Sequence, residues 1–464
     1  MVFGDGWRWV IARTVMPHRA PPLLAAAALL AACGGDPTPQ APTTPTETLA
    51  FPAMLNRDID ILFVVDDSGS MLEEQAALAA AFPEFVAMLG RIDGGVPNVH
   101  LGVVSTNVGT GGENIGGCST TAEPDGDDGA LQTGQCAGIT GSFLSDLARP
   151  DGTREVNYTG TLAEQFSCVT ALGVGGCGYE QPLEAMRRAL SPGRNLGFLR
   201  PNAALAVVFV GDEDDCSASD PALFGDPNAT ATSPLGPRTS FRCFEFGTVC
   251  DPDTDPRASG TRTGCRSRED SPYLASVASY TAFLRGLKAD PSQVVVTSLI
   301  GAVDDARTAV VGPDPNQVDA PALQPSCTSD RGVAYPGFRL ADFTAAFHGT
   351  SRSICEPTVA APLGTFASRI TTALGVPCFA HALKDADAAV AGVQATCTVT
   401  DRARTTGATN AVPACDDDPS GTCWRMVADA ARCPLAPGNL RLAIDRPGDR
   451  DLTDVTTTAS CAIE

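Results

Sequence analysis

The sequence predicts an α/β protein with a doubly wound, mostly parallel sheet, which is a sheet covered by helices on both faces. Residues 59–65 (IDILFVV) and 204–210 (ALAVVFV) are short, nearly unbroken runs of apolar, β-rich residues. Such runs are typical of strands that are buried on both faces of a parallel sheet. Between them lie segments such as 180–190, where apolar residues recur at the spacing of a core-facing helix. This alternation predicts one main domain over residues 51–376.

The other expected elements follow the same alternation along the chain. Further strands are expected at 99–106, 293–300 and 352–355, and further helices at 73–90, 162–173, 273–288, 339–347 and 363–374. Loop-rich insertions are expected near 107–158, 216–270 and 301–338, where turn-forming residues gather and no period is sustained. After residue 376 the helical periodicity ends, and the cysteines of residues 377–464 predict a small cysteine-rich β module.

Oxygen-bearing side chains follow the first strand of the main domain directly. Asp66, Ser68 and Ser70 occupy alternate positions, and a helix is expected to begin just after them. Open α/β sheets bind ligands beyond the carboxyl ends of their strands, so this corner is a candidate site. A carboxylate and two hydroxyls suit a hard cation such as Mg²⁺, which takes oxygen ligands and keeps several waters. Ser70, with Glu73 three residues on, also fits a helix N-cap, and the two roles are compatible.

This stretch resembles the von Willebrand factor type A (VWA) domain. The metal-ion-dependent adhesion site (MIDAS) of that family carries the pattern Asp-x-Ser-x-Ser, which stands here as Asp66-Asp67-Ser68-Gly69-Ser70. The resemblance implies a Rossmann-like fold and a bound Mg²⁺, with Mn²⁺ or Ca²⁺ as alternatives. It also implies that Asp212, which follows the strand at 204–210, contacts the metal through water. The partner then supplies a carboxylate as the last ligand of the ion.

The second loop of the expected metal site departs from the family. Where the family commonly has Gly-Gly-Thr, with the Thr on the metal, this chain has Gly175-Gly176-Cys177. Cys177 is expected in a disulfide, with Cys168 as a suggested partner, because a thiolate is a poor ligand for Mg²⁺. Glu180 is expected to reach the ion instead. Whether the metal site is altered, weakened or lost stays open.

The acids that follow Asp212 have several possible roles. Asp214 and Asp215 lie in the run Asp212-Glu213-Asp214-Asp215, which suits either a Ca²⁺ site or a hydrated acidic surface. The favoured interpretation is a solvated rim for Asp214 and Asp215.

The N-terminus predicts export. Residues 23–32 (LLAAAALLAA) are too short to span a bilayer but match the apolar core of a signal peptide. Together with Cys33, residues 1–33 resemble a bacterial lipoprotein signal, which implies lipid attachment to Cys33; an ordinary secretory signal is the alternative. The Pro/Thr-rich stretch 34–50 is expected to be an extended tether. Of the 17 cysteines, those other than Cys33 are even in number, compatible with eight disulfides in an oxidising compartment.

Several functional classes are excluded. The net charge of −22 argues against nucleic acid as a partner, because phosphate binding needs clustered Lys and Arg. Residues 173–178 match the dinucleotide pattern G-x-G-x-x-G, but they follow an expected helix where the pattern requires a strand. We do not expect an enzyme, because the chain has no G-x-S-x-G motif and no His linked by motif to a nucleophile.

Two functions remain. The leading hypothesis is an adhesion-type binding protein of the bacterial cell envelope, at the outer membrane or cell surface. A lipid anchor would attach it to the membrane, and its VWA metal site would contact a protein or another extracellular ligand. The alternative is a structural or assembly lipoprotein with a degenerate metal site, and the replacement of the usual Thr by Cys177 favours it.

Overall fold

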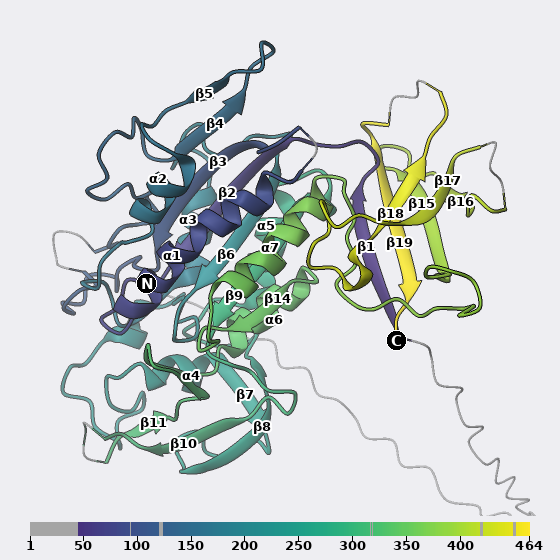
Figure 1. Ribbon diagram of the computed structural model, residues 1–464. Coiled ribbons are helices and arrows are strands. Elements are labelled where there is room, and N and C mark those ends of the chain that lie inside the picture. The colour runs from purple at the N-terminus through teal and green to yellow at the C-terminus, as the bar shows by residue number, and fades with distance from the viewer. Residues whose placement is uncertain are drawn as a thin grey trace, which may run out of the picture. The chain divides into compact units, whose positions relative to one another are not determined.

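The computed structural model describes residues 45–92, 94–119, 124–315, 317, 319–417, 421–448 and 452–464. The expected signal, Cys33 and residues 34–44 of the expected tether lie outside these ranges. The described chain is a mixed α/β structure with several sheets and eight disulfides (Figure 1). Within these ranges, no helix combines the length and the apolar character needed to cross a membrane.

The main sheet has seven strands in the order β14-β9-β6-β2-β3-β4-β5. They are β2 (Asp58–Val65), β3 (Asn98–Ser105), β4 (Leu144–Ala148), β5 (Arg154–Val156), β6 (Ala204–Val210), β9 (Val294–Ile300) and β14 (Thr350–Ser353). The strands from β14 to β3 are parallel, whereas β4 runs antiparallel to β3 and β5 antiparallel to β4. The predicted α/β class is confirmed, and the sheet is mixed, with parallel pairing from β14 to β3 and antiparallel pairing at β4 and β5.

Helices cover both faces of this sheet (Figure 1). They are α1 (Leu72–Leu89), α2 (Leu162–Val169), α3 (Pro182–Leu190), α5 (Val277–Gly286), α6 (Phe338–Ala346) and α7 (Ala360–Ala373). Phe63 of β2 packs edge to face against Phe82 of α1, Phe166 of α2 and Phe366 of α7. The neighbouring Leu62 belongs to the core on the opposite face, which includes residues of α3, α5 and α6. Consecutive residues of a strand point to opposite faces, so β2 is buried on both.

The expected insertion at 107–158 is not all loop. It contains β4 and β5, which extend the main sheet at one edge. The prediction missed them because both are short antiparallel strands in a Gly- and Asp-rich stretch, without the apolar run that marks a central strand.

The insertions at 216–270 and 301–338 combine into a smaller unit. The two segments share a sheet in the order β11-β10-β8-β7, and β12 and β13 form a separate two-stranded sheet. The elements of the two segments are η1 (Pro221–Phe224), α4 (Phe241–Gly247), β7 (Thr248–Asp251), β8 (Gly260–Ser267), β10 (Ala309–Pro313), β11 (Pro321–Leu323), β12 (Cys327–Thr328) and β13 (Val333–Ala334). The 3₁₀ turn η2 (Pro291–Gln293) lies outside both segments, directly before β9. Residues 216–270 and 301–338 are therefore structured together rather than as separate loops.

The C-terminal region is β-rich, and the chain's first described strand belongs to it. Its elements are β1 (Thr46–Pro52), β15 (Cys397–Ala403), β16 (Thr409–Val412), β17 (Cys423–Ala428), η3 (Pro437–Asn439), β18 (Leu440–Asp445) and β19 (Val455–Ala462). Strand β1 pairs antiparallel with β19, from Thr46 opposite Ala462 to Pro52 opposite Thr456. The prediction of a tether over 34–50 is therefore wrong from residue 46 onward, because these residues gain a full set of strand partners.

The described cysteines form eight disulfides, as expected from their number. The pairs are 118–177, 136–168, 216–243, 250–265, 327–355, 378–433, 397–461 and 415–423. Cys177 is bonded, but its partner is Cys118, so the suggested pairing with Cys168 is wrong.

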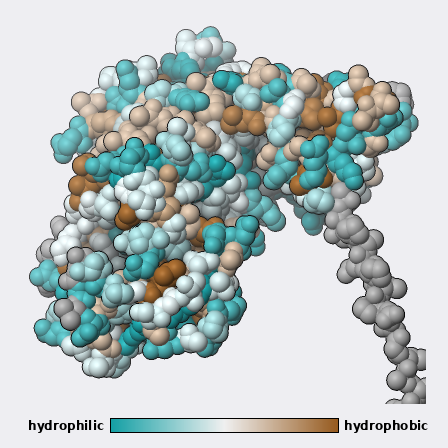
Figure 2. Space-filling model, turned by 60° about the horizontal axis from the view of Figure 1, so that its bottom comes forward, coloured by the Kyte–Doolittle hydropathy of each residue, from teal (hydrophilic) through white to brown (hydrophobic). Residues whose placement is uncertain are grey.

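Hydrophobic residues are dispersed on the surface seen in Figure 2. They form small, separate patches between hydrophilic residues. Since small apolar patches are normal on soluble proteins, they mark no binding face on this side. The functional argument therefore turns to the polar groups at the edge of the main sheet.

Candidate functional site

Strand register brings the two expected carboxylates together. Strands β2 and β6 are parallel neighbours, and their last pair is Val65 opposite Val210. Asp66 and Gly211 follow this pair, and the Asp66 backbone N–H donates to the Val210 carbonyl at 2.9 Å. The Asp66 and Asp212 carboxyl groups lie within hydrogen-bonding range of each other. The carboxyl ends of two adjacent strands thus supply one acidic pair.

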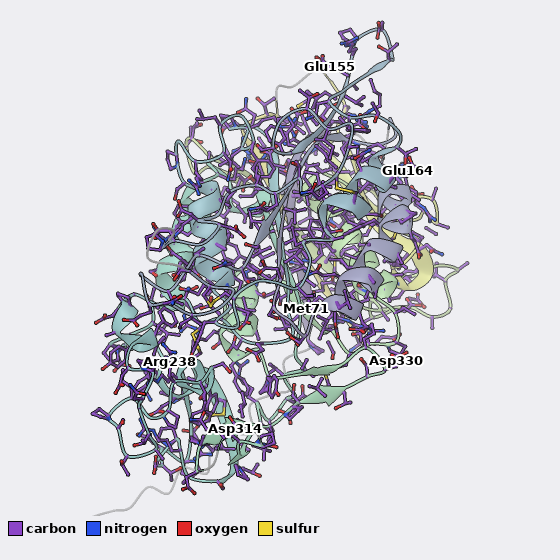
Figure 3. All side chains as sticks on the ribbon, turned by 90° about the vertical axis from the view of Figure 1, so that its left-hand side faces the viewer. Met71, Glu155, Glu164, Arg238, Asp314 and Asp330 are labelled. Atoms are coloured by element: carbon purple, nitrogen blue, oxygen red, sulfur yellow. A yellow bond between two sulfur atoms is a disulfide. The ribbon has the colours of Figure 1, made fainter. Side chains whose placement is uncertain are left out.

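The two serines complete this corner. The backbone N–H of Ser68 donates to Asp66 Oδ1 at 2.7 Å, and the Ser68 and Ser70 hydroxyls are 3.1 Å apart. The Ser70 hydroxyl lies near Asp212 and lowers the pKa of that carboxyl against the opposing effect of burial. The alternative role of Ser70 as a helix N-cap is wrong, because Met71 is the N-cap residue of α1. Figure 3 shows Met71 at the end of α1 that lies toward the segments carrying Arg238 and Asp314.

The second loop is fixed by its backbone and by a disulfide. The Gly176 N–H donates to the Asp67 carbonyl at 2.8 Å, and a Cβ at Gly176 would lie 2.2 Å from Asp67 Cγ. Glycine is therefore required for this close approach. Cys177 is buried and bonded to Cys118, so its sulfur is not a free ligand. The position where the resembled family has a metal-binding Thr thus holds a structural crosslink.

Glu180 lies beside a carboxylate that the sequence argument did not single out. Its carboxyl group and that of Glu213 are within hydrogen-bonding range of each other. Glu213 directly follows Asp212, so the acidic run after β6 was the signal that could have identified it. The backbone around Glu180 is held on both sides, because Cys216 N–H donates to the Glu180 carbonyl and Gln181 N–H donates to the Thr106 carbonyl.

These four carboxylates, Asp66, Asp212, Glu180 and Glu213, are called the acid cluster below. Burial raises the pKa of each, well above the usual range for Asp66 and Glu180 and to about 7 for Glu213. In the part of the chain that the structure describes, no Lys, Arg or His is among the groups that shift them. Asp66 Oδ2, Asp212 Oδ1 and Glu180 Oε1 are buried without a hydrogen-bond partner. Buried charges normally have partners or bind metals, so the acid cluster fits a cation.

Asp214 and Asp215 do not form a solvated rim. Asp215 is fully buried and accepts hydrogen bonds from Nε and Nη2 of the buried Arg339, at 3.1 and 3.0 Å. Asp214 accepts from the backbone N–H of Arg339. The prediction failed because the partner lies in a distant helix. These two residues hold the loop after β6 in place, and Asp215 is neutralised by the Arg339 guanidinium, unlike the acid cluster.

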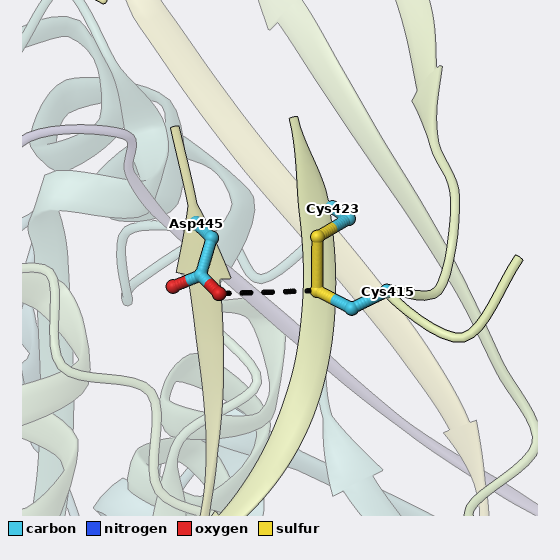
Figure 4. Close-up of side chains that lie close together, drawn as sticks. All are labelled: Cys415, Cys423 and Asp445. Atoms are coloured by element: carbon cyan, nitrogen blue, oxygen red, sulfur yellow. Dashed lines mark hydrogen bonds between the residues drawn. A yellow bond between two sulfur atoms is a disulfide. The ribbon is translucent and has the colours of Figure 1, made fainter. Parts of the chain in front are cut away.

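A different group meets a strict metal-ligand distance test. The test asks for three His, Cys, Asp or Glu residues whose ligand atoms all lie within 4.8 Å of one another. Among the described residues, one group meets it, which consists of Cys415, Cys423 and Asp445 (Figure 4). The two cysteines are joined in a disulfide, so no thiolate is available there. Asp66, Asp212 and Glu180 do not form such a trio, and serine hydroxyls lie outside this test. Whether Glu180 completes the ligands of the first ion therefore stays a prediction.

The acid cluster predicts an unusual pH dependence for the metal-free protein. A carboxyl group whose pKa is raised by folding stabilises the fold below its unfolded pKa, about 4, and this stabilisation is lost as pH rises through its folded pKa. Glu213, with a pKa raised to about 7, places the loss between about pH 4 and 7. We expect a lower melting temperature at pH 8 than at pH 5 in EDTA. Excess Ca²⁺ or Mg²⁺ should remove the difference, and an equal loss with and without metal would contradict this account.

The comparisons with known proteins found similar solved structures for this chain. No family model matches it, and no curated protein matches it. Solved structures similar to it include the pilus adhesin RrgA from Streptococcus pneumoniae, at 11% identity and a TM-score of 0.28, covering 90% of this chain and 58% of that one. The adhesive tip pilin GBS104 from Group B Streptococcus agalactiae is 9% identical with a TM-score of 0.29, and the match covers 90% of this chain and 82% of that one. The human COPII-coat protein Sec24c is 9% identical with a TM-score of 0.27, and the match covers 90% of this chain and 46% of that one. With such low TM-scores, these likenesses carry no weight for fold family or function.

Proposed function

We propose that this chain is an adhesion-type binding protein of the bacterial cell envelope, anchored through Cys33, with a VWA domain that contacts a protein or another extracellular ligand through a divalent cation. The observation that carries the proposal is the convergence of Asp66, Ser68, Ser70 and Asp212 at one edge of the sheet, with buried carboxylate oxygens that lack partners. Mg²⁺ held by such a set keeps water ligands, and a partner's oxygen can replace one of them. The role assigned to these residues is binding rather than catalysis.

Replacing Asp66 by alanine tests this proposal. In the wild-type protein, saturating Mg²⁺ or Mn²⁺ at 100 times its dissociation constant should stabilise the fold by about 2.7 kcal/mol. The Asp66→Ala variant should lose this stabilisation, because it lacks the carboxylate that lies beside Ser68. Thermal denaturation over a metal titration measures the effect. Glu73→Ala, which removes an exposed carboxylate at the start of α1, is the matched control and should respond like the wild type. Metal-independent stability in the wild type would reject the mechanism.

A second candidate function is a structural or assembly lipoprotein with a degenerate metal site. The disulfide between Cys118 and Cys177 favours it, because the loop that commonly supplies a hydroxyl ligand in the resembled family is used as a crosslink. Absence of bound metal in the purified protein, together with a partner that still co-purifies, would support this candidate over the first.

A further inference from the structure

We propose that three exposed apolar side chains around the proposed metal corner form a docking surface for a segment of a partner protein, one that presents aliphatic side chains beside a Lys or Arg. The three residues are Leu72, Val174 and Val333, and they are called the apolar rim below. The inference rests on the proposed function and deepens it. The cation of that proposal contacts an oxygen of the partner, whereas the apolar rim selects the side chains next to that oxygen.

The first two members of the apolar rim lie on segments that are held at the end of β2. Leu72 is the first residue of α1 and is 57% exposed. In the first turn of this helix, the buried Gln75 donates from Nε2 to the Asp66 carbonyl at 2.8 Å and to the Gly173 carbonyl at 2.9 Å. Its Oε1 accepts from the Gly173 N–H at 3.2 Å. Val174, the next residue, is 36% exposed and is therefore fixed beside both α1 and the end of β2.

Val333 reaches the same corner from the antiparallel pair β12–β13. It is 40% exposed, and two residues further on the Tyr335 N–H donates to the Asp212 carbonyl at 2.7 Å. On its other side, a Cβ at Gly332 would lie 3.1 Å from Oε1 of the buried Glu74. Glu74 belongs to the first turn of α1. Each member of the apolar rim thus lies on a segment that begins this turn or contacts it.

This convergence distinguishes the apolar rim from ordinary exposed apolar residues. Single apolar side chains on a surface are normal and need no partner. The described residues include ten large apolar side chains that are exposed, and three of them lie on the three segments that meet at this corner. A partner that approaches the corner covers these three together, and the apolar area that it removes from water contributes to affinity. The apolar rim is therefore expected to select aliphatic side chains.

Charge next to the apolar rim indicates which partner fits. Glu73 is exposed directly after Leu72. Asp330, whose side chain is 93% exposed, lies in the turn between β12 and β13, near the end of α1 that carries Met71 (Figure 3). The neighbouring Arg331 is 3.9 Å from Asp330, but its side chain is only 13% exposed and its guanidinium donates to backbone carbonyls that follow β14.

A Lys or Arg of the partner therefore meets exposed carboxylates beside the apolar contact, whereas an acidic side chain at the same place is repelled. A second copy of this chain is a poor occupant for the same reason, because each copy carries a net charge of −22. The occupant that these observations favour is a basic and aliphatic segment of a different protein.

The test begins with a random-peptide phage library that is panned on the immobilised full chain in Mg²⁺. Enriched peptides are expected to carry Leu, Ile or Val beside Lys or Arg. The most enriched peptide is then synthesised and titrated against each variant by calorimetry. The double variant Leu72→Ser/Val333→Ser should bind it roughly tenfold more weakly or worse, because two aliphatic contacts are lost. Asp330→Asn should weaken binding several-fold and make it less sensitive to salt.

Two matched controls carry the same kinds of substitution elsewhere. Leu196→Ser removes an 81% exposed leucine from the connection between α3 and β6, which lies at the opposite ends of the strands. Glu84→Gln removes an exposed carboxylate further along α1. Both controls should bind the peptide like the wild type. Near-ultraviolet circular dichroism checks that every variant is folded.

The outcomes separate this inference from the proposed function. The inference is overturned if no peptide is enriched, if the enriched peptides lack the basic and aliphatic pattern, or if the double variant binds as well as the wild type. None of these results touches the metal-dependent stability on which the proposed function depends. Peptide binding that is lost in the double variant but equal in Mg²⁺ and EDTA would overturn the role of the cation and support the apolar rim. Self-association of the wild type that the double variant loses would make a second copy the occupant and overturn the proposed partner.

Discussion

Replacing Asp60 by alanine is expected to lower the free energy of unfolding by about 3–5 kcal/mol, the usual cost of breaking a buried ion pair. Asp60 lies in β2 with no exposed surface and accepts hydrogen bonds from the backbone N–H and Nε of Arg200, both at 2.7 Å. The Nζ of Lys288, whose side chain is fully buried, is 3.8 Å from its Oδ2. Without Asp60, Lys288 loses this counter-charge while remaining in the interior, and Arg200 keeps its 3.9 Å contact with Asp58.

Burial explains why the removal of Asp60 should lower the free energy of unfolding so strongly. It raises the pKa of Asp60 in spite of the neighbouring Arg200 and Lys288, and it lowers the pKa of Lys288. Desolvation therefore opposes both charges, and it is offset by the contacts of Asp60 with Arg200 and Lys288 and by the hydrogen bond from Lys288 Nζ to the Arg200 carbonyl. Asp58→Ala is the matched control, because Asp58 lies two residues away, is 43% exposed and is 3.9 Å from the same Arg200. Urea denaturation should show a loss below about 1 kcal/mol for Asp58→Ala. Equal losses in the two variants would contradict the argument.

The strands that position the acid cluster could be predicted from the sequence for a simple physical reason. Both β2 and β6 are buried on two faces, so nearly every residue in them is apolar and the run stands out. The resemblance to the VWA domain implied that Asp66 and Asp212 lie together, and the parallel pairing of β2 with β6 brings them to one edge. The binding of a metal by these residues stays a prediction.

The remaining features depend on partners that are remote in the sequence. Arg339 is 124 positions from Asp215, so the sequence could not show that this member of an apparently hydrated acidic run is paired in the core. Strand β1 finds its partner in β19 at the other end of the chain, and a Pro/Thr-rich segment carries no sign of that pairing. Glu180 and Glu213 lie on separate loops, and only the fold shows that they form a pair.

Replacing Asp215 by alanine is expected to cost about 3–5 kcal/mol of stability and to weaken metal binding as well. Both Asp215 and Arg339 are fully buried, and Asp215 also accepts hydrogen bonds from Leu183 N–H at 3.1 Å and from the Ser217 hydroxyl. The variant leaves the Arg339 guanidinium in the core without its counter-charge. Because Asp215 follows Asp212 and Glu213 closely, its loss also frees the loop that carries these two members of the acid cluster.

A double variant separates the charge effect from the loss of local hydrogen bonds. In Asp215→Ala/Arg339→Met no charge is left without a partner, so urea denaturation should show that a large part of the lost stability returns. Glu356→Ala is the control for a partly exposed pair with Arg352 and should cost less than about 1 kcal/mol. If the double variant is no more stable than Asp215→Ala, the uncompensated charge is not the cause. The hydrogen bonds to Leu183 and Ser217 would then be the main contribution of Asp215 to stability. Metal affinity should stay low in both variants, because neither restores the contacts by which Asp215 holds the loop after β6.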